Sequence, residues 1–182
     1  RDLVRSRGLG DVYKRQLQWL NKTVELASSD LTEQEIKDRL NDYLSFEISS
    51  PTNLRKTREI LMNIWVYEND ISNKLRDEAI SIVRDMPEYA LVAHWCMMMA
   101  NYPVFVDMCK LIGRLSEFQD EITLSQIKQK LYDEWGERTT LYHSIDKLIS
   151  TLKALSVLQC DKPGKYQIVK HFVGNSLSLI HI

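Results

Sequence analysis

The chain has 182 residues, of which 44% are hydrophobic and 27% charged, with 24 basic and 25 acidic residues. This size is enough for one domain or for two small ones that share a core, and folding should bury roughly two-thirds of the unfolded surface. The most apolar run, residues 90–100, is much shorter than the roughly 20 residues of a membrane helix, so we expect no membrane span. The odd number of cysteines (Cys96, Cys109 and Cys160) and the lack of CxxC spacing favour reduced core residues of a cytoplasmic protein.

Both ends of the chain read as translated sequencing adapter. Residues 11–16 are the in-frame product of GAT-GTG-TAT-AAG-AGA-CAG, the end sequence used in transposase-based library preparation, and residues 177–182 match its opposite strand. We therefore treat residues 1–16 and 177–182 as non-native and leave them out of the fold prediction. The native segment, residues 17–176, then has 19 basic and 23 acidic residues and a net charge of −4. If this interpretation is correct, we expect the natural N-terminus to be missing.

The first half of this segment predicts short amphipathic helices. Apolar spacing predicts a helix over residues 17–27, and Thr32 with Glu35 forms a capping box for a second helix that ends near Phe46. Residues 49–52 then separate it from a third helix, residues 53–67, with Ile60 among its inward residues. A fourth helix begins at Asp70 or Ser72, buries Leu75 and ends before Pro87. Residues 88–101 are apolar almost all round, which predicts the central buried helix.

The second half predicts a different arrangement. Residues 104–118 form a helix in which Gly113 allows close helix contact, and residues 125–135 form another that Gly136 ends. Thr139 or Thr140 caps the next helix, and two strands, residues 157–160 and 166–169, flank turn residues. The predicted fold class is mainly α: a truncated helical bundle (residues 17–103) that continues into a C-terminal winged helix-turn-helix with a short β-hairpin (residues 104–176).

Charge differs between these two parts. Residues 17–103 carry a net charge of −5 and residues 104–176 a net charge of +1, so the winged part is the better candidate for an anionic partner. The densest basic cluster nevertheless lies in the third helix, at Arg55, Lys56 and Arg58. Such a cluster can position phosphates. The alternative is a solvated helix face on which Glu59 pairs with these cations.

If the winged part binds duplex DNA, its second helix enters the major groove with its N-terminal residues nearest the bases. The candidate residues are Arg138, Thr139, Thr140, Tyr142, His143 and Lys147 in that helix, and Lys162 and Lys165 at the tip of the hairpin. Arg138 or His143 would read base edges, whereas Thr140 and Lys147 would hold phosphate. Four nearby acids, Asp133, Glu134, Glu137 and Asp146, weaken the local field, so this segment alone should bind weakly. The alternative is an adaptor or scaffold whose winged helix docks a protein.

Nothing in the sequence predicts an enzyme. It has no glycine-rich phosphate loop, no HExxH, no GxSxG and no histidine pair at metal spacing. His94 and Cys96 lie in the apolar helix, where a hydrogen-bonded core histidine is commoner than a ligand or a nucleophile. We expect no catalytic residue, metal, cofactor or small-molecule substrate.

Five short stretches resemble the family of BrxA-type accessory proteins of BREX phage-exclusion systems, and the similarity covers most of residues 17–173. These stretches are Asn53-Leu54-Arg55-Lys56-Thr57-Arg58, Ala93-His94-Trp95, Tyr102-Pro103-Val104-Phe105, Ile112-Gly113-Arg114-Leu115 and Trp135-Gly136-Glu137-Arg138-Thr139-Thr140. The resemblance implies a non-enzymatic, DNA-contacting component of bacterial antiviral defence. It also implies a larger protein assembly with ATPase and methyltransferase partners.

Overall fold

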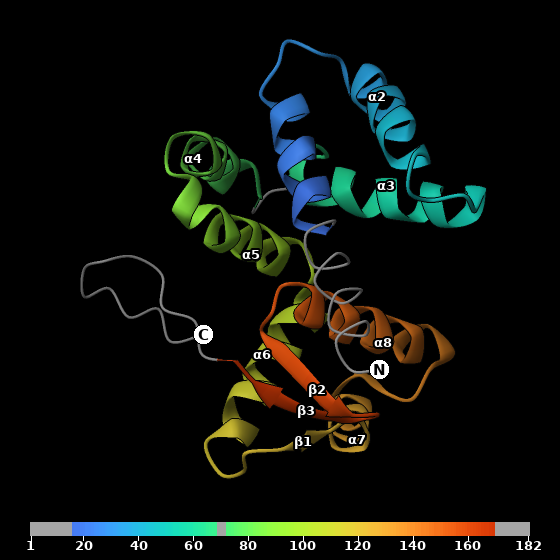
Figure 1. Ribbon diagram of the computed structural model, residues 1–182, viewed down its shortest axis with the longest axis vertical. Coiled ribbons are helices and arrows are strands. Elements are labelled where there is room, and N and C mark those ends of the chain that lie inside the picture. The colour runs from blue at the N-terminus through green and yellow to red at the C-terminus, as the bar shows by residue number, and fades with distance from the viewer. Residues whose placement is uncertain (1–15, 69–71, 170–182) are drawn as a thin grey trace, which may run out of the picture. The chain divides into compact units, whose positions relative to one another are not determined.

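A computed structural model describes residues 16–68 and 72–169 and is mainly helical, with one small antiparallel sheet (Figure 1). The two adapter-like segments lie outside the described residues, apart from Gln16, which begins the first helix; Asp70 lies outside them too. The chain divides into two compact units, an N-terminal unit, Leu17–Tyr102, and a C-terminal unit that begins at Pro103. The sequence placed this boundary one residue later.

The N-terminal unit consists of helices. They are the first helix (residues 16–27), α2 (Glu33–Ser45), α3 (Pro51–Trp65), α4 (Ser72–Asp85), the short 3-10 helix η1 (Pro87–Tyr89) and α5 (Ala90–Asn101). The capping box before α2 is confirmed, because the Glu35 N–H donates to Thr32 Oγ1 over 3.3 Å and the Thr32 N–H donates to Glu35 Oε2 over 2.8 Å. Helix α3 begins earlier than predicted, because Ser50 caps it and Pro51 needs no hydrogen-bond acceptor at the first helical position.

Apolar side chains from these helices form the core of the N-terminal unit. Its most buried members are Leu40, Leu44, Met62, Trp65 and Met97. The prediction that Ile60 and Leu75 face inward was wrong, since both are about two-fifths exposed. Cys96 is exposed as well, because α5 has a solvent side in spite of its apolar composition. Cys109 and Cys160 are half-buried rather than core residues.

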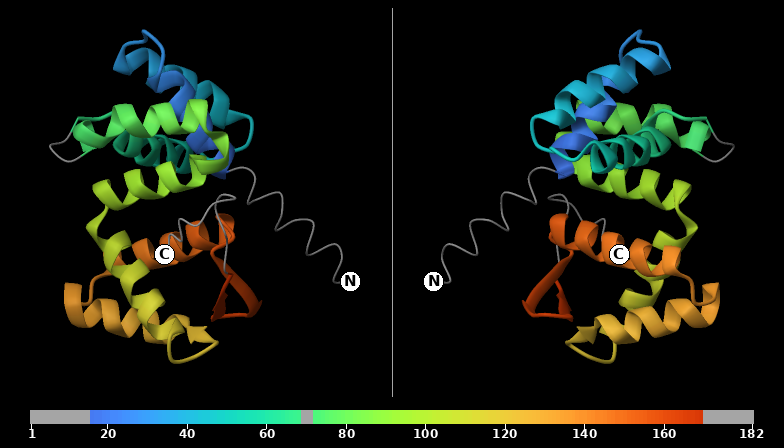
Figure 2. Two further views of the ribbon diagram at one scale, coloured as in Figure 1. Left: turned by 90° about the vertical axis from the view of Figure 1, so that its left-hand side faces the viewer. Right: turned by 90° about the vertical axis from the view of Figure 1, so that its right-hand side faces the viewer.

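The C-terminal unit alternates helices and strands. They are α6 (Pro103–Ser116), β1 (Ile122–Thr123), α7 (Leu124–Trp135), α8 (Thr139–Ala154), β2 (Leu158–Lys162) and β3 (Lys165–Ile168). The strands form an antiparallel sheet in the order β1-β3-β2, with Ile122 opposite Tyr166 and Leu158 opposite Ile168. Figure 2 shows the hairpin and the α7–α8 pair from two further sides. The predicted hairpin is present, whereas β1 was not predicted, because two residues show no alternation that indicates a strand.

Short-range signals fix the ends of these elements. Gly136 ends α7 with φ +75°, and Gly164 adopts φ +76° in the β2–β3 turn. Between them, Arg138 precedes α8 without a side-chain cap, so the prediction that a threonine caps this helix was wrong. Gly113 lies in open space, since a Cβ there would meet no atom within 4 Å, and the predicted close helix contact is absent. The inward residues of α8 are Leu141, Ile145, Ile149 and Leu152.

Candidate nucleic-acid interface

The first turns of α8 present a polar, exposed face. Every residue from Gly136 to Thr140 is exposed, and the face continues through Tyr142, His143 and Lys147. Leu141 and Ile145 recur four residues apart on the buried side; of the residues between them, Tyr142 and His143 are exposed and Ser144 is half-buried. The structure therefore leaves all six candidates exposed, Arg138 just before α8 and the other five within it.

Arg138 is attached to the preceding helix by its own side chain. Its Nη2 donates to the Trp135 carbonyl oxygen over 2.8 Å, which leaves other guanidinium N–H groups facing solvent. Trp135 is itself held, because its Nε1–H donates to Asp107 Oδ2 of α6 over 3.1 Å. The Arg138 guanidinium thus extends from a connection that α6 and α7 fix in place.

Two aromatic rings lie side by side on the α8 face. The ring centroids of Tyr142 and His143 are 5.4 Å apart at an interplanar angle of 86°, an edge-to-face arrangement. Tyr142 remains 44% exposed. Beneath it, Lys128 of α7 holds its Nζ 3.5 Å from the Tyr142 ring centroid and 2.9 Å from Asp146 Oδ1. Sequence reasoning missed Lys128, because no periodic pattern links residues on two different helices.

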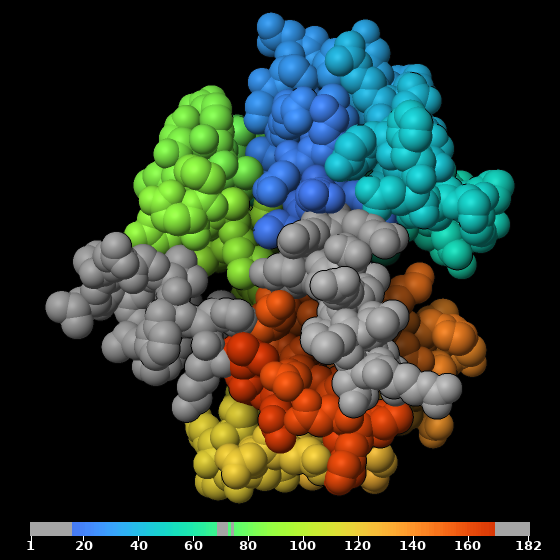
Figure 3. Space-filling view, in the orientation of Figure 1, coloured from blue at the N-terminus to red at the C-terminus, as the bar shows by residue number. Residues whose placement is uncertain are grey.

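The hairpin carries the two remaining candidates of this unit, and they differ in their contacts. Lys162 is exposed, whereas Lys165 forms an ion pair with Glu121, just before β1. The turn is also tied to α7, since the Leu124 N–H donates to the Gly164 carbonyl oxygen over 2.8 Å. The hairpin reaches the molecular surface on the face seen in Figure 3. Of these two lysines, Lys162 is the one available for an external contact.

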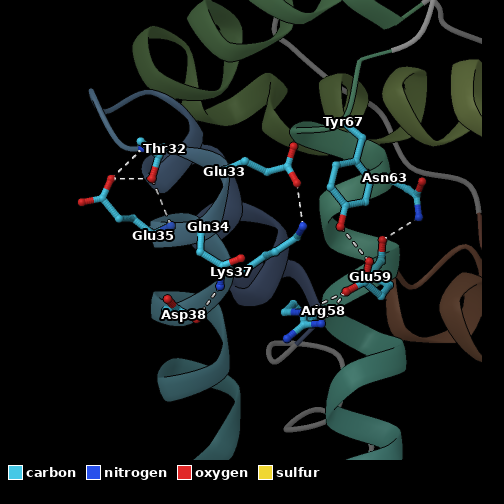
Figure 4. Close-up of polar contacts among 10 residues, drawn as sticks. All are labelled: Thr32, Glu33, Gln34, Glu35, Lys37, Asp38, Arg58, Glu59, Asn63 and Tyr67. Carbon is cyan, nitrogen blue, oxygen red and sulfur yellow. Dashed lines mark hydrogen bonds and ion pairs between the residues drawn. The ribbon is translucent and has the colours of Figure 1, made fainter.

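The basic cluster of α3 belongs to the N-terminal unit, and its three cations differ in their contacts. Arg55 and Lys56 are exposed, but Arg58 is engaged: its Nη2 lies 2.5 Å from Glu59 Oε1, and its Nη1 donates to Asn41 Oδ1 over 3.1 Å. Figure 4 shows the contacts of Arg58 with Glu59 on α3, where the Tyr67 hydroxyl also donates to Glu59 Oε2 over 2.7 Å. Hydrogen bonds from Tyr67 and Arg58 lower the pKa of Glu59 below its usual value of 4.5. Arg58 therefore joins two helices of the N-terminal unit.

The buried histidine is a core residue with one hydrogen bond. His94 is fully buried, and its Nε2 lies 2.7 Å from Asn21 Oδ1, while Nδ1 has no partner. Burial lowers its pKa from 6.5 to about 4. Within the described part of the chain, no three histidine, cysteine or acidic side chains gather closely enough to hold a metal ion. None of the helices in residues 16–68 and 72–169 has the length and apolar character needed to cross a bilayer.

Comparisons of this chain with protein-family models, with curated proteins and with solved structures find no match.

Proposed function

We propose that the C-terminal unit is a winged helix-turn-helix that contacts duplex DNA through the first turns of α8 and has no catalytic role. The observation that carries this proposal is the exposure of residues 136–140, Tyr142 and His143 around the buried Leu141, with Lys147 exposed one turn later. In helix-turn-helix proteins the N-terminal residues of the second helix contact base edges in the major groove. The order α6-β1-α7-α8-β2-β3 supports this interpretation, since a hairpin follows the second helix directly.

Three cations supply the proposed contacts. Arg138 has the forked donor geometry that pairs with guanine in the major groove, whereas Lys147 and Lys162 act as point charges that hold phosphates. Lys165 is paired with Glu121, and therefore we assign it to the support of the hairpin. If Lys147 and Lys162 each meet one phosphate, the logarithm of the binding constant should fall with the logarithm of salt concentration at a slope of about −1.8.

The test is binding of a fluorescent DNA duplex to the full chain, measured by anisotropy over a range of salt concentrations. We expect R138A/K147A to weaken binding at low salt and to make the slope shallower by about 0.9, the share of the Lys147 phosphate contact. R55A/K56A removes the same formal charge from exposed positions of α3 and should leave the affinity at low salt and the salt slope unchanged. Because residues 1–16 contain five basic residues, the chain cut back to residues 17–176 is measured as well. Equal loss in the two double variants would contradict the proposal.

A protein-docking role is the second candidate. Phe118 follows α6 in the turn before β1 and is 87% exposed, so its ring is accessible to a partner protein. The resemblance to BrxA-type proteins adds an assembly with larger partners in bacterial phage defence. Failure of the folded chain to bind duplex DNA at low salt would favour this second candidate over the first.

A further inference from the structure

One lysine of α7 lies beneath the proposed DNA-contacting helix. Lys128 Nζ is 2.9 Å from Asp146 Oδ1 and 3.5 Å from the centroid of the Tyr142 ring, so one ammonium group meets two residues that lie a turn apart on α8. Its side chain is 14% exposed, compared with 40% for Asp146. Lys128 therefore has little surface of its own for a partner to contact.

The carboxylate that Lys128 meets is the single acidic group of α8. Asp146 directly precedes Lys147 and lies one turn beyond Tyr142 and His143. An unneutralised carboxylate beside Lys147 would repel phosphate at the position where that lysine is expected to attract it. A nearby ammonium cancels this field and leaves the charge of Lys147 uncompensated.

The ammonium also acts on Tyr142. A cation over an aromatic face is attracted by the ring and restrains its orientation. Desolvation lowers the pKa of Lys128, but hydrogen bonds with Asp146 and Tyr142 outweigh it, and the pKa lies above its usual value of 10.5. The lysine is therefore charged at neutral pH. It supports a tyrosine whose ring in turn meets the His143 ring edge-to-face.

We propose that Lys128 is a positioning residue for the α8 interface: it neutralises Asp146 and holds Tyr142 in place without touching the nucleic acid. This inference rests on the proposed DNA-binding function and adds a residue that makes none of the proposed DNA contacts itself.

The test is a mutant cycle in the full chain, with the same duplex and salt series. K128M keeps most of the aliphatic stem but removes the charge. Asp146 is then no longer neutralised and should lower the affinity for the duplex about threefold to tenfold at low salt. Its salt slope should become shallower by about 0.9, the equivalent of one phosphate contact. K128R keeps the charge and should bind like the wild type. The double variant K128M/D146N should recover the wild-type affinity, because the carboxylate that needed neutralising is gone.

Recovery in the double variant is the decisive result. A lysine that also touched phosphate would leave K128M/D146N weaker than the wild type, because its own contact would stay lost, and that outcome overturns the inference. Wild-type affinity in K128M overturns it too. If K128M fails to fold, D146N decides the question: affinity equal to or tighter than wild type supports the inference, and weaker binding overturns it.

A second measurement does not depend on DNA. With its Nζ over the ring, Lys128 should show ε-methylene proton resonances shifted upfield by the Tyr142 ring current, and Y142L should abolish this shift. Absence of the shift in the wild type overturns the inference alone and leaves the proposed function standing. Absence of DNA binding in a wild type that shows the shift overturns the proposed function, and the positioning role with it.

Discussion

His94 should make the N-terminal unit lose stability in mild acid. Its buried ring meets Asn21 Oδ1 through Nε2 and packs against Trp65 with 5.2 Å between ring centroids. Because an amide oxygen only accepts hydrogen bonds, the neutral ring must donate from Nε2, and Nδ1 is left as an acceptor without a partner. Protonation would add a charge to this buried site and place a proton on Nδ1, which has no partner.

The size of the effect follows from the pKa shift. Burial lowers the pKa of His94 from 6.5 to about 4, so below pH 6.5 the unfolded chain binds a proton that the folded chain refuses. The stability contribution is therefore fully present above pH 6.5 and is lost as the pH falls toward 4. At about 1.4 kcal/mol for each pKa unit, the loss approaches roughly 3 kcal/mol, a large share of the roughly 5–15 kcal/mol typical of a domain.

The assay is urea unfolding of the full chain, followed by tryptophan fluorescence and repeated between about pH 7.5 and pH 4.5. H94Q can still donate to Asn21 but cannot titrate, so its free energy of unfolding should vary much less over this window. H143Q, at an exposed position of α8, should keep the wild-type pH dependence. Glu35 and Glu59 have lowered pKa values and lose their contribution only near and below pH 4.5, equally in all three proteins. A slope in H94Q as steep as in the wild type would refute the reasoning.

Two further predictions concern glycines and cysteines of the described chain. G136A should destabilise the C-terminal unit by about 1–2 kcal/mol, because φ +75° is strained for alanine. G113A should stabilise the unit by about 0.5–1 kcal/mol, since a Cβ at this helix position meets open space. Chemical denaturation measures both changes in the free energy of unfolding, and two changes of the same sign would contradict the prediction. With a disulfide reagent at neutral pH, Cys96 should react much faster than Cys109, because Cys96 is exposed and burial raises the pKa of the Cys109 thiol to about 12. Faster labelling of Cys109, read by mass spectrometry of the labelled peptides, would show that this packing is wrong.

Local chemistry explains which elements could be predicted from the sequence. Capping at Thr32 and the glycine stop at Gly136 act within four residues, so the chain itself displays them. The short strand β1 is different, because Ile122 and Thr123 become a strand only through pairing with β3. Exposure of Cys96 likewise depends on which side of α5 other helices leave uncovered, and apolar composition does not encode that choice.

The same distinction applies to the candidate interface. From the sequence alone, four acidic residues near the candidate contacts should repel the phosphates of DNA. A carboxylate repels a phosphate strongly, however, only when no cation already neutralises it. Asp146 meets Lys128, a residue 18 positions earlier, and Glu121 meets Lys165, 44 positions later. Each pair removes one acid and one base from the field that a partner would meet. Within residues 16–68 and 72–169, Lys147 and Lys162 form no ion pair, and Arg138 bonds to a carbonyl oxygen. Asp146 therefore no longer offsets the charge of Lys147, whereas Asp133, Glu134 and Glu137 are exposed close to Arg138 in the sequence and still weaken the field there.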